Sequence, residues 1–210
     1  MSSSGETRSK PLSADDGRRA RGRGTRERLL ATARAEFGVH GYDATSIETI
    51  LDGAGVARGA LYHHFASKEA LFDGVLDQVI AELASSVRRT AQAGADPAEN
   101  LKLGALAWLE LVLDPAIQQI VLLDAPAVVG WTRWRTIDDE HTLGATKAAL
   151  RRLADAGRLP AEATDMLAHL VLAAVGEAAL LIARADDPAA ALTAGRAALD
   201  VLLDRLLVRA

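Results

Sequence analysis

The sequence has 210 residues, of which 50% are hydrophobic and 25% are charged, and this length allows one large or two small domains with a sizeable buried core. Cysteine is absent, which excludes a disulfide framework, a thiolate zinc site and a thiol redox sensor. The formal net charge is −4, but residues 1–68 carry +3, from 11 Lys and Arg against 8 Asp and Glu, and the remaining residues carry −7. This asymmetry is typical of a basic domain that contacts nucleic acid, attached to an acidic domain.

Residues 1–24 are rich in Ser, Gly and Arg and contain almost no apolar side chains. Such a segment cannot bury enough surface to offset the entropy of ordering it, so we predict a disordered basic arm. Its run of Arg18, Arg19, Arg21 and Arg23 either contacts DNA, along the phosphates or in a minor groove, or remains a solvated tail. The segment has no apolar stretch of the kind that signals secretion, so we expect a cytoplasmic location.

Residues 25–71 are predicted to form a three-helix domain. The first helix, 25–39, starts at the cap residue Thr25. Thr45 and Glu48 are spaced as a capping box at the start of a second helix, which Gly55 ends because glycine adopts a left-handed φ without strain. A third helix follows over 57–64, and this helix-turn-helix pattern is typical of proteins that place the second of the paired helices in the major groove. The apolar stripe of the first helix comprises Leu29, Leu30, Ala33 and Phe37.

From Gly55 to Leu71 the chain reads Gly-Val-x-x-Gly-x-Leu-Tyr-x-His-Phe-x-x-Lys-Glu-x-Leu. This spacing resembles the DNA-binding domain of the TetR (tetracycline repressor) family of bacterial transcription regulators, over about residues 25–76. By the same resemblance, the residues expected to contact bases are Arg58, Ala60 and His63, and the arginine is suited to guanine. The resemblance also implies that five residues contact DNA phosphates, namely Thr45, Ser46, Tyr62, His64 and Lys68.

Two further features of this motif concern its core and the start of its third helix. Leu61 and Phe65 share an apolar side with Val56, so we expect both in the core. Ala57 stands where the family commonly has a Ser or Thr cap. We therefore expect the base-reading helix to be less well anchored.

The rest of the chain, 72–210, is predicted to be an entirely helical domain, which makes the fold class all-α. A long helix over 67–92 joins it to the DNA-binding domain. Three Asp-Pro pairs mark helix starts, because aspartate caps a helix and proline suits its first position. Pro126 interrupts one segment, and Gly157 with Pro160 separates two others. The further predicted helices are 97–112, 116–125, 130–156, 161–184 and 188–208.

The last two predicted helices are apolar on nearly all sides. Such a helix must be buried nearly all round, so one face is expected to cover the domain core and the other to meet a second copy in a homodimer with a four-helix interface. The alternatives are a core helix in a monomer and a membrane span. His169 and Glu177 interrupt the apolar run 166–183 and charged residues flank it, so we expect no membrane partner.

The resemblance further implies that a small, apolar effector binds the C-terminal domain and releases a repressor from a palindromic operator. Aromatic side chains in this domain can line an apolar cavity, and the same tryptophans also suit an ordinary core. Asp124, His141, His169 and Glu177 would orient the effector. The candidate ligand-binding residues are Trp108, Asp124, Trp131, Trp134, His141, His169 and Glu177.

Two other classes of function are kept as alternatives. A helical metal-binding protein or enzyme would use carboxylates and imidazoles on shared helix faces, namely Asp138, His141, Asp165 and His169. An architectural DNA-binding protein would bind duplexes without sequence preference and with a steep salt dependence. The sequence contains no nucleophile elbow, phosphate-binding glycine loop or HExxH motif, so the main interpretation has no catalytic residue, no cofactor and no metal.

Overall fold

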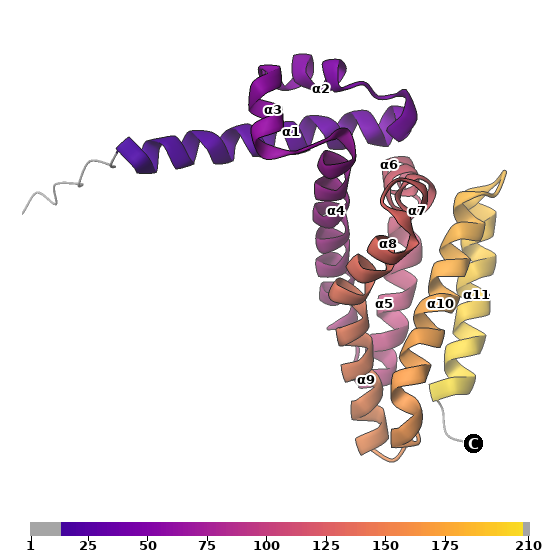
Figure 1. The fold of residues 1–210 in the computed structure, drawn as a ribbon. Coiled ribbons are helices and arrows are strands. Elements are labelled where there is room, and N and C mark those ends of the chain that lie inside the picture. The colour runs from indigo at the N-terminus through magenta and orange to yellow at the C-terminus, as the bar shows by residue number, and fades with distance from the viewer. Residues whose placement is uncertain (1–13, 208–210) are drawn as a thin grey trace, which may run out of the picture.

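The computed structural model describes residues 14–207, apart from the side chains of residues 14–21 and 138, and every regular element in that range is helical. This confirms the all-α fold class. Figure 1 shows three helices lying across the end of a helical bundle. The first part, which we call the head, consists of α1 (Ala14–Ala44), α2 (Ile47–Ala54) and α3 (Arg58–His64).

The second part, which we call the body, is a helical bundle. Helix α4 (Lys68–Ala91) leads from the head into the bundle, and α5 packs along it. Helices α10 and α11 pack together on the opposite side of α5 from α4 (Figure 1). The other elements are α5 (Pro97–Leu111), α6 (Pro115–Ile117), the π-helical turn η1 (Gln118–Asp124), α7 (Ala125–Val128), α8 (Gly130–Asp138), the π-helical turn η2 (Asp139–Leu143), α9 (Gly144–Asp155), the 3-10 turn η3 (Ala161–Ala163), α10 (Thr164–Ala183) and α11 (Pro188–Leu207).

Helix α1 begins eleven residues before the predicted start at residue 25. The prediction of disorder is therefore wrong for residues 14–24, and residues 1–13 of the predicted arm lie outside the described range. The physical reason is cooperativity: once the buried stripe from Leu29 to Phe37 fixes the helix, each further residue adds a backbone hydrogen bond, and Arg and Ala have high helix propensity. The stripe itself is confirmed, because all four of its residues are buried.

The Asp-Pro pairs start helices as predicted. The Oδ1 atom of Asp96 accepts the backbone N–H of Ala98 at 2.7 Å and of Glu99 at 3.2 Å. These two hydrogen bonds stabilise the carboxylate and hold the pKa of Asp96 below its usual value. Asp114 and Asp187 cap α6 and α11 in the same way. Local sequence therefore sets where these body helices begin.

Two of the predicted body helices contain π-helical turns. The segment predicted as 116–125 continues through η1 and α7 to Val128. Pro126 has no N–H to donate to the carbonyl of Leu122, so the helix loosens in the turn before it instead of ending. The second turn, η2, lies in the middle of the predicted helix 130–156 and packs against α4.

Head and body meet at the end of α1. A Cβ added at Gly38 would lie 2.7 Å from the Cβ of Ala116, so glycine lets α1 approach α6 closely. Three residues later, Gly41 has a φ of 77° and kinks the end of α1. Beyond the kink, the backbone N–H of Tyr42 donates to Oδ2 of Asp124 at 2.7 Å. Contacts on both sides of the kink thus hold the head to α6 and η1.

We predict that Gly38→Ala destabilises the protein relative to Gly24→Ala. Both substitutions add the same methyl group to α1, but the space around Gly24 is open within 4 Å. Both variants gain similar helix propensity, so the difference between their free energies of unfolding reports the overpacking at Gly38 alone. We expect this difference to be about 1–3 kcal/mol. Urea unfolding measures this difference, and equal free energies of unfolding would show that α1 and α6 are not in close contact.

Candidate nucleic-acid interface

The second helix starts one residue later than predicted. Ser46 is the N-cap of α2, and its Oγ accepts the backbone N–H of Thr49 at 3.0 Å. Thr45 is only 3% exposed, and its hydroxyl donates to the carbonyl of Gly41 at 2.8 Å. The predicted capping box of Thr45 and Glu48 is therefore wrong, because the carbonyl at the kink of α1 takes the threonine hydroxyl. Thr45 is a buried support of this joint, and its hydroxyl is taken up by the Gly41 carbonyl.

The turn between the paired helices matches the prediction. Gly55 has a φ of 61° and a ψ of 44°, the left-handed conformation that ends α2. Ala57 precedes α3 and makes no side-chain cap hydrogen bond. Leu61 is fully buried and Phe65 is 6% exposed, which confirms both as core residues. The core therefore anchors one side of α3 and leaves the other side free.

The free side of α3 carries most of the predicted DNA-contacting residues. Arg58, Tyr62 and His63 are exposed, whereas Ala60 and His64 are half-buried. Ser46 is exposed at the start of α2. Lys68, at the start of α4, has its Nζ atom 4.1 Å from the centroid of the Tyr42 ring. The ring holds the lysine ammonium in place by a cation–π contact.

Arg58, the predicted guanine reader, forms an ion pair with Glu48 across the turn. The two side chains are 58% and 63% exposed. An exposed ion pair contributes only about 0–1 kcal/mol, so the guanidinium can leave Glu48 for a base at little cost. Sequence reasoning missed Glu48 as the partner of Arg58, because it assigned this glutamate to the cap.

The electrostatic environment of His64 favours its neutral form. Partial burial lowers the pKa of His64 below its usual value, and the neighbouring His63 and Arg26 lower it further. A neutral imidazole can donate one hydrogen bond to a phosphate. An approaching phosphate would also stabilise the protonated ring, because opposite charges favour ionisation.

The predicted ligand-binding residues of the body have several different environments. Trp131 and Trp134 lie together on α8, with ring centroids 5.0 Å apart. Asp124 binds the head, as described above, and Trp108 packs against the core from α5. Glu177 is exposed on α10. These predicted residues therefore differ in exposure and in the parts of the molecule that they contact.

The metal-binding alternative built on Asp138, His141, Asp165 and His169 is not supported by the geometry. Oδ1 of Asp165 lies 3.1 Å from Nη2 of Arg151. Nδ1 of His169 lies 3.5 Å from Nη2 of Arg135, and Nε2 of His141 lies 3.3 Å from Oδ1 of Asp77. The side chain of Asp138 lies outside the described part of the chain. The three described residues of this set thus have different partners.

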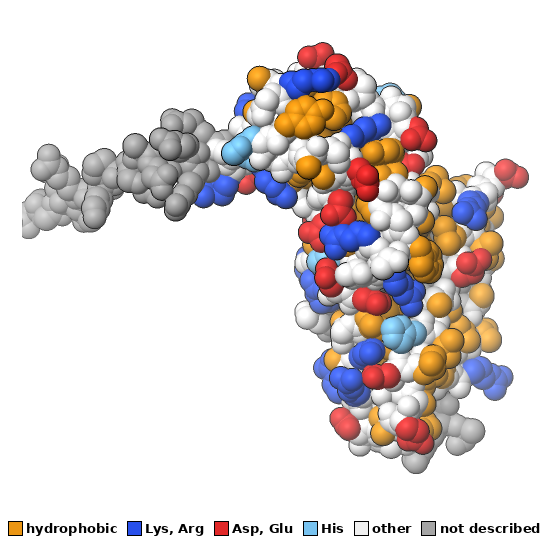
Figure 2. Space-filling view, in the orientation of Figure 1, with side chains coloured by type: hydrophobic (Ala, Val, Ile, Leu, Met, Phe, Trp, Pro, Cys, Tyr) orange, Lys and Arg blue, Asp and Glu red, His pale blue; other side chains and the backbone are white. Residues whose placement is uncertain are grey.

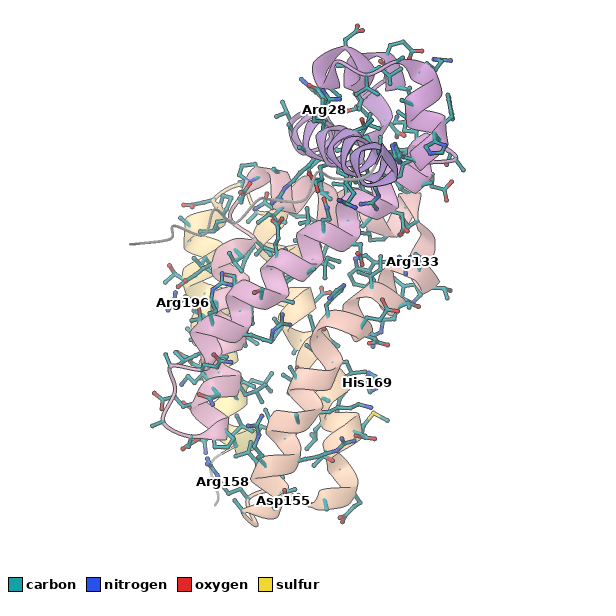
Figure 3. The ribbon with its side chains drawn as sticks, turned by 90° about the vertical axis from the view of Figure 1, so that its left-hand side faces the viewer. Arg28, Arg133, Asp155, Arg158, His169 and Arg196 are labelled. Atoms are coloured by element: carbon teal, nitrogen blue, oxygen red, sulfur yellow. The ribbon has the colours of Figure 1, made fainter. Side chains whose placement is uncertain are left out.

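A contact that sequence reasoning missed joins α4 to α8. Arg133 donates from Nε to Oδ1 of Asp73 at 2.9 Å and from Nη2 to Oδ2 at 3.1 Å, and this pairing raises the pKa of Arg133. Figure 3 shows Arg133 near the head and His169 farther down the body. The pair borders an open hollow of about 310 Å³, lined by Ser67, Glu69, Ala70, Asp73, Val129 and Arg133.

Two models of known protein families match this chain. The model for bacterial regulatory proteins of the tetR family matches residues 29–75, which contain the helix-turn-helix. The model for the tetracyclin repressor-like C-terminal domain matches residues 98–206, about half of the chain. Together the two matches cover most of the head and most of the body.

Individual proteins show the same similarity. The crystal structure of a TetR-family transcriptional regulator from Pectobacterium atrosepticum is 36% identical, with a TM-score of 0.79 over 91% of this chain and 98% of that one. The transcriptional repressor AcnR of Corynebacterium efficiens is 28% identical over 72% of this chain and 77% of its own length. The transcriptional repressor KstR2 of Mycobacterium tuberculosis is 34% identical over 55% of this chain, and the match spans only 58% of that repressor.

We predict that binding of a DNA duplex strengthens as the pH is lowered from 7.5 to 6. The pKa of His64 is depressed in the free protein and rises next to a phosphate, so binding takes up a proton. Fluorescence anisotropy at constant ionic strength should show an affinity gain of about 3- to 10-fold for one proton. His64→Gln keeps a hydrogen-bond donor but cannot titrate in this range, so its gain should be smaller. An unchanged pH dependence in this variant would contradict the assignment.

Proposed function

Because the chain belongs to the TetR family of bacterial transcriptional regulators, we propose that it is a repressor that binds a palindromic DNA operator as a homodimer and is released by a small apolar molecule. The observation that carries this proposal is the free side of α3. Arg58, Tyr62 and His63 are exposed there, while the buried Leu61 holds the helix in position. A short helix anchored on one side can enter a major groove without rearranging the head.

The DNA-facing side chains have two proposed roles. Contacts to phosphate set the position of the head on the duplex but carry no sequence information. Contacts to base edges carry the sequence preference, and a bidentate arginine on guanine contributes about 1–3 kcal/mol of discrimination. The phosphate contacts are Ser46, Tyr62, His64 and Lys68. The base contacts are Arg58, Ala60 and His63.

The outer faces of α10 and α11 support the homodimer. The inner side of α10, with Val171, Val175 and Ala179, is buried within the body. Figure 2 shows hydrophobic side chains along the side of the molecule that these two helices form. Large exposed apolar surfaces mark interaction sites, and a two-fold axis here would build a four-helix interface. On these two helices, the large exposed hydrophobic residues are Met166, Leu170, Leu181, Val201 and Leu202.

We propose that a second protomer, and not a lipid bilayer, covers the outer faces of α10 and α11. By length and composition, the helical segment Ala161–Ala183 could cross a membrane, and so could the bent pair Pro97–Leu111 and Pro115–Val128 taken together. One or two such helices are weak support for a span, because core helices of folded bundles have the same composition. Asp165 and Glu177 lie exposed on α10 and would face the hydrocarbon region of a bilayer.

The proposed effector contact is the aromatic pair Trp131 and Trp134 on α8. Trp131 is 63% exposed, so a flat apolar molecule can stack on it. Trp134 donates from Nε1 to the carbonyl of Val121, 3.2 Å away in η1. A ligand that moves α8 would therefore also pull on η1.

From η1 the movement can pass to the head. Asp124, the last residue of η1, accepts the backbone N–H of Tyr42. The Tyr42 ring in turn holds the ammonium of Lys68, a proposed phosphate contact. An effector shifts operator binding only as far as it prefers one arrangement over the other, and such coupling is typically about 1–3 kcal/mol.

Selection of duplexes from a random DNA pool, followed by sequencing, tests the proposed function. We predict enrichment of a two-fold-symmetric site, because two identical heads read two half-sites. Arg58→Ala should lose preference at one position of each half-site. Tyr62→Ala and Lys68→Ala should weaken all sequences alike, by about tenfold. Tight binding without enrichment would favour the architectural alternative, and an unchanged preference in Arg58→Ala would refute its role as a base reader.

A further inference from the structure

Three side chains with metal-ligating atoms meet where α4 packs against η2. The ligand atoms of Asp77, Glu140 and His141 all lie within 4.8 Å of one another. Oδ1 of Asp77 and Nε2 of His141 are 3.3 Å apart, although the two residues are 64 positions apart in the chain. Asp77 belongs to the long helix that joins head and body, and the other two belong to the body.

The π-helical turn explains how two consecutive residues reach the same point. Glu140 and His141 are neighbours in η2, which spans Asp139–Leu143. A π turn has more residues per turn than an α-helix, so successive side chains diverge by a smaller angle. The side chains of Glu140 and His141 can therefore both face Asp77 on α4. π turns of this kind are frequent at functional sites.

The charges at this point suit a divalent cation. The two carboxylates of Asp77 and Glu140 lie together here, beside a histidine ring that can supply a nitrogen ligand. Arg133 binds Asp73 with two nitrogens, and its positive charge also acts on Glu140 and Asp77. Arg135 lies beside Asp139 and His169. A cation bound between Asp77 and Glu140 would neutralise both carboxylates.

We propose that Asp77, Glu140 and His141 form a binding site for a divalent first-row transition cation such as Zn²⁺. Zinc takes nitrogen and oxygen ligands at about 2.0–2.2 Å in a tetrahedral arrangement, which places neighbouring ligand atoms about 3.3 Å apart. Asp77 and His141 already have this separation, and small side-chain rotations bring in Glu140. Three protein ligands leave the fourth position to water or to another small ligand.

The site is accessible and lies outside the helix-turn-helix. The side chains of His141 and Asp77 are 25% and 49% exposed, and Glu140 is exposed, so a cation can enter from solvent. A bound cation would link α4 directly to η2. The proposal does not depend on the proposed function, because it concerns only the binding of the metal.

Titration of the metal-free full-length protein with Zn²⁺ by isothermal calorimetry tests this proposal. The variants are His141→Ala, Asp77→Asn and Glu140→Gln. The matched control is His40→Ala, because His40 is an exposed histidine that lies 3.8 Å from one carboxylate, that of Glu36. Circular dichroism melts without metal establish that each variant is folded before its affinity is compared.

We expect His141→Ala to lose one Zn²⁺ site per protomer or to weaken it at least tenfold. Asp77→Asn and Glu140→Gln should weaken the same site, and His40→Ala should behave as wild type. At a Zn²⁺ concentration 100-fold above Kd, the melting temperature of the wild type should rise by about 5–10 °C, and that of His141→Ala should rise less. Equal stoichiometry and affinity in the wild type and His141→Ala would overturn the proposal, and so would an equal loss in His40→Ala.

Discussion

At the junction of head and body, Asp124 accepts the backbone N–H of Tyr42, and Gly38 lets α1 lie against α6. Both contacts act on the end of α1, the helix against which α2 and α3 pack. If η1 moved alone, the N–H of Tyr42 would lose its partner, and a partly buried N–H without a partner is unfavourable. This joint therefore ties the position of α1, and of the helices α2 and α3 that pack on it, to the body.

Much of the fold follows from local rules that can be applied to the sequence. The aspartate of each Asp-Pro pair caps a helix through hydrogen bonds to residues two or three positions away. Gly55 needs only its own left-handed φ to end α2. Leu61 and Phe65 are buried because the period of α3 places them on its apolar side. Interactions of this range are encoded within a few residues, so the sequence predicts them well.

Contacts between distant elements could not be predicted in this way. Thr45 and Ser46 are both good caps, and the choice depends on the carbonyl of Gly41 at a kink that the sequence did not indicate. His141 shares a predicted helix face with Asp138, but the packing of η2 against α4 brings Asp77 to it instead. Packing between distant elements also gives the predicted ligand residues Asp124, His141 and His169 different partners.

A double-mutant cycle on DNA binding tests most directly whether the joint controls the head. Operator affinity is measured for the wild type, Asp124→Ala, Lys68→Ala and the double variant, under conditions where all four are folded. Asp124 accepts the backbone N–H of Tyr42, and the Tyr42 ring contacts the ammonium of Lys68. Lys68→Ala should therefore reduce DNA affinity by a smaller factor in the Asp124→Ala background than in the wild type. We predict a coupling energy of about 0.5–1.5 kcal/mol. Effects that add within about 0.3 kcal/mol would contradict the account.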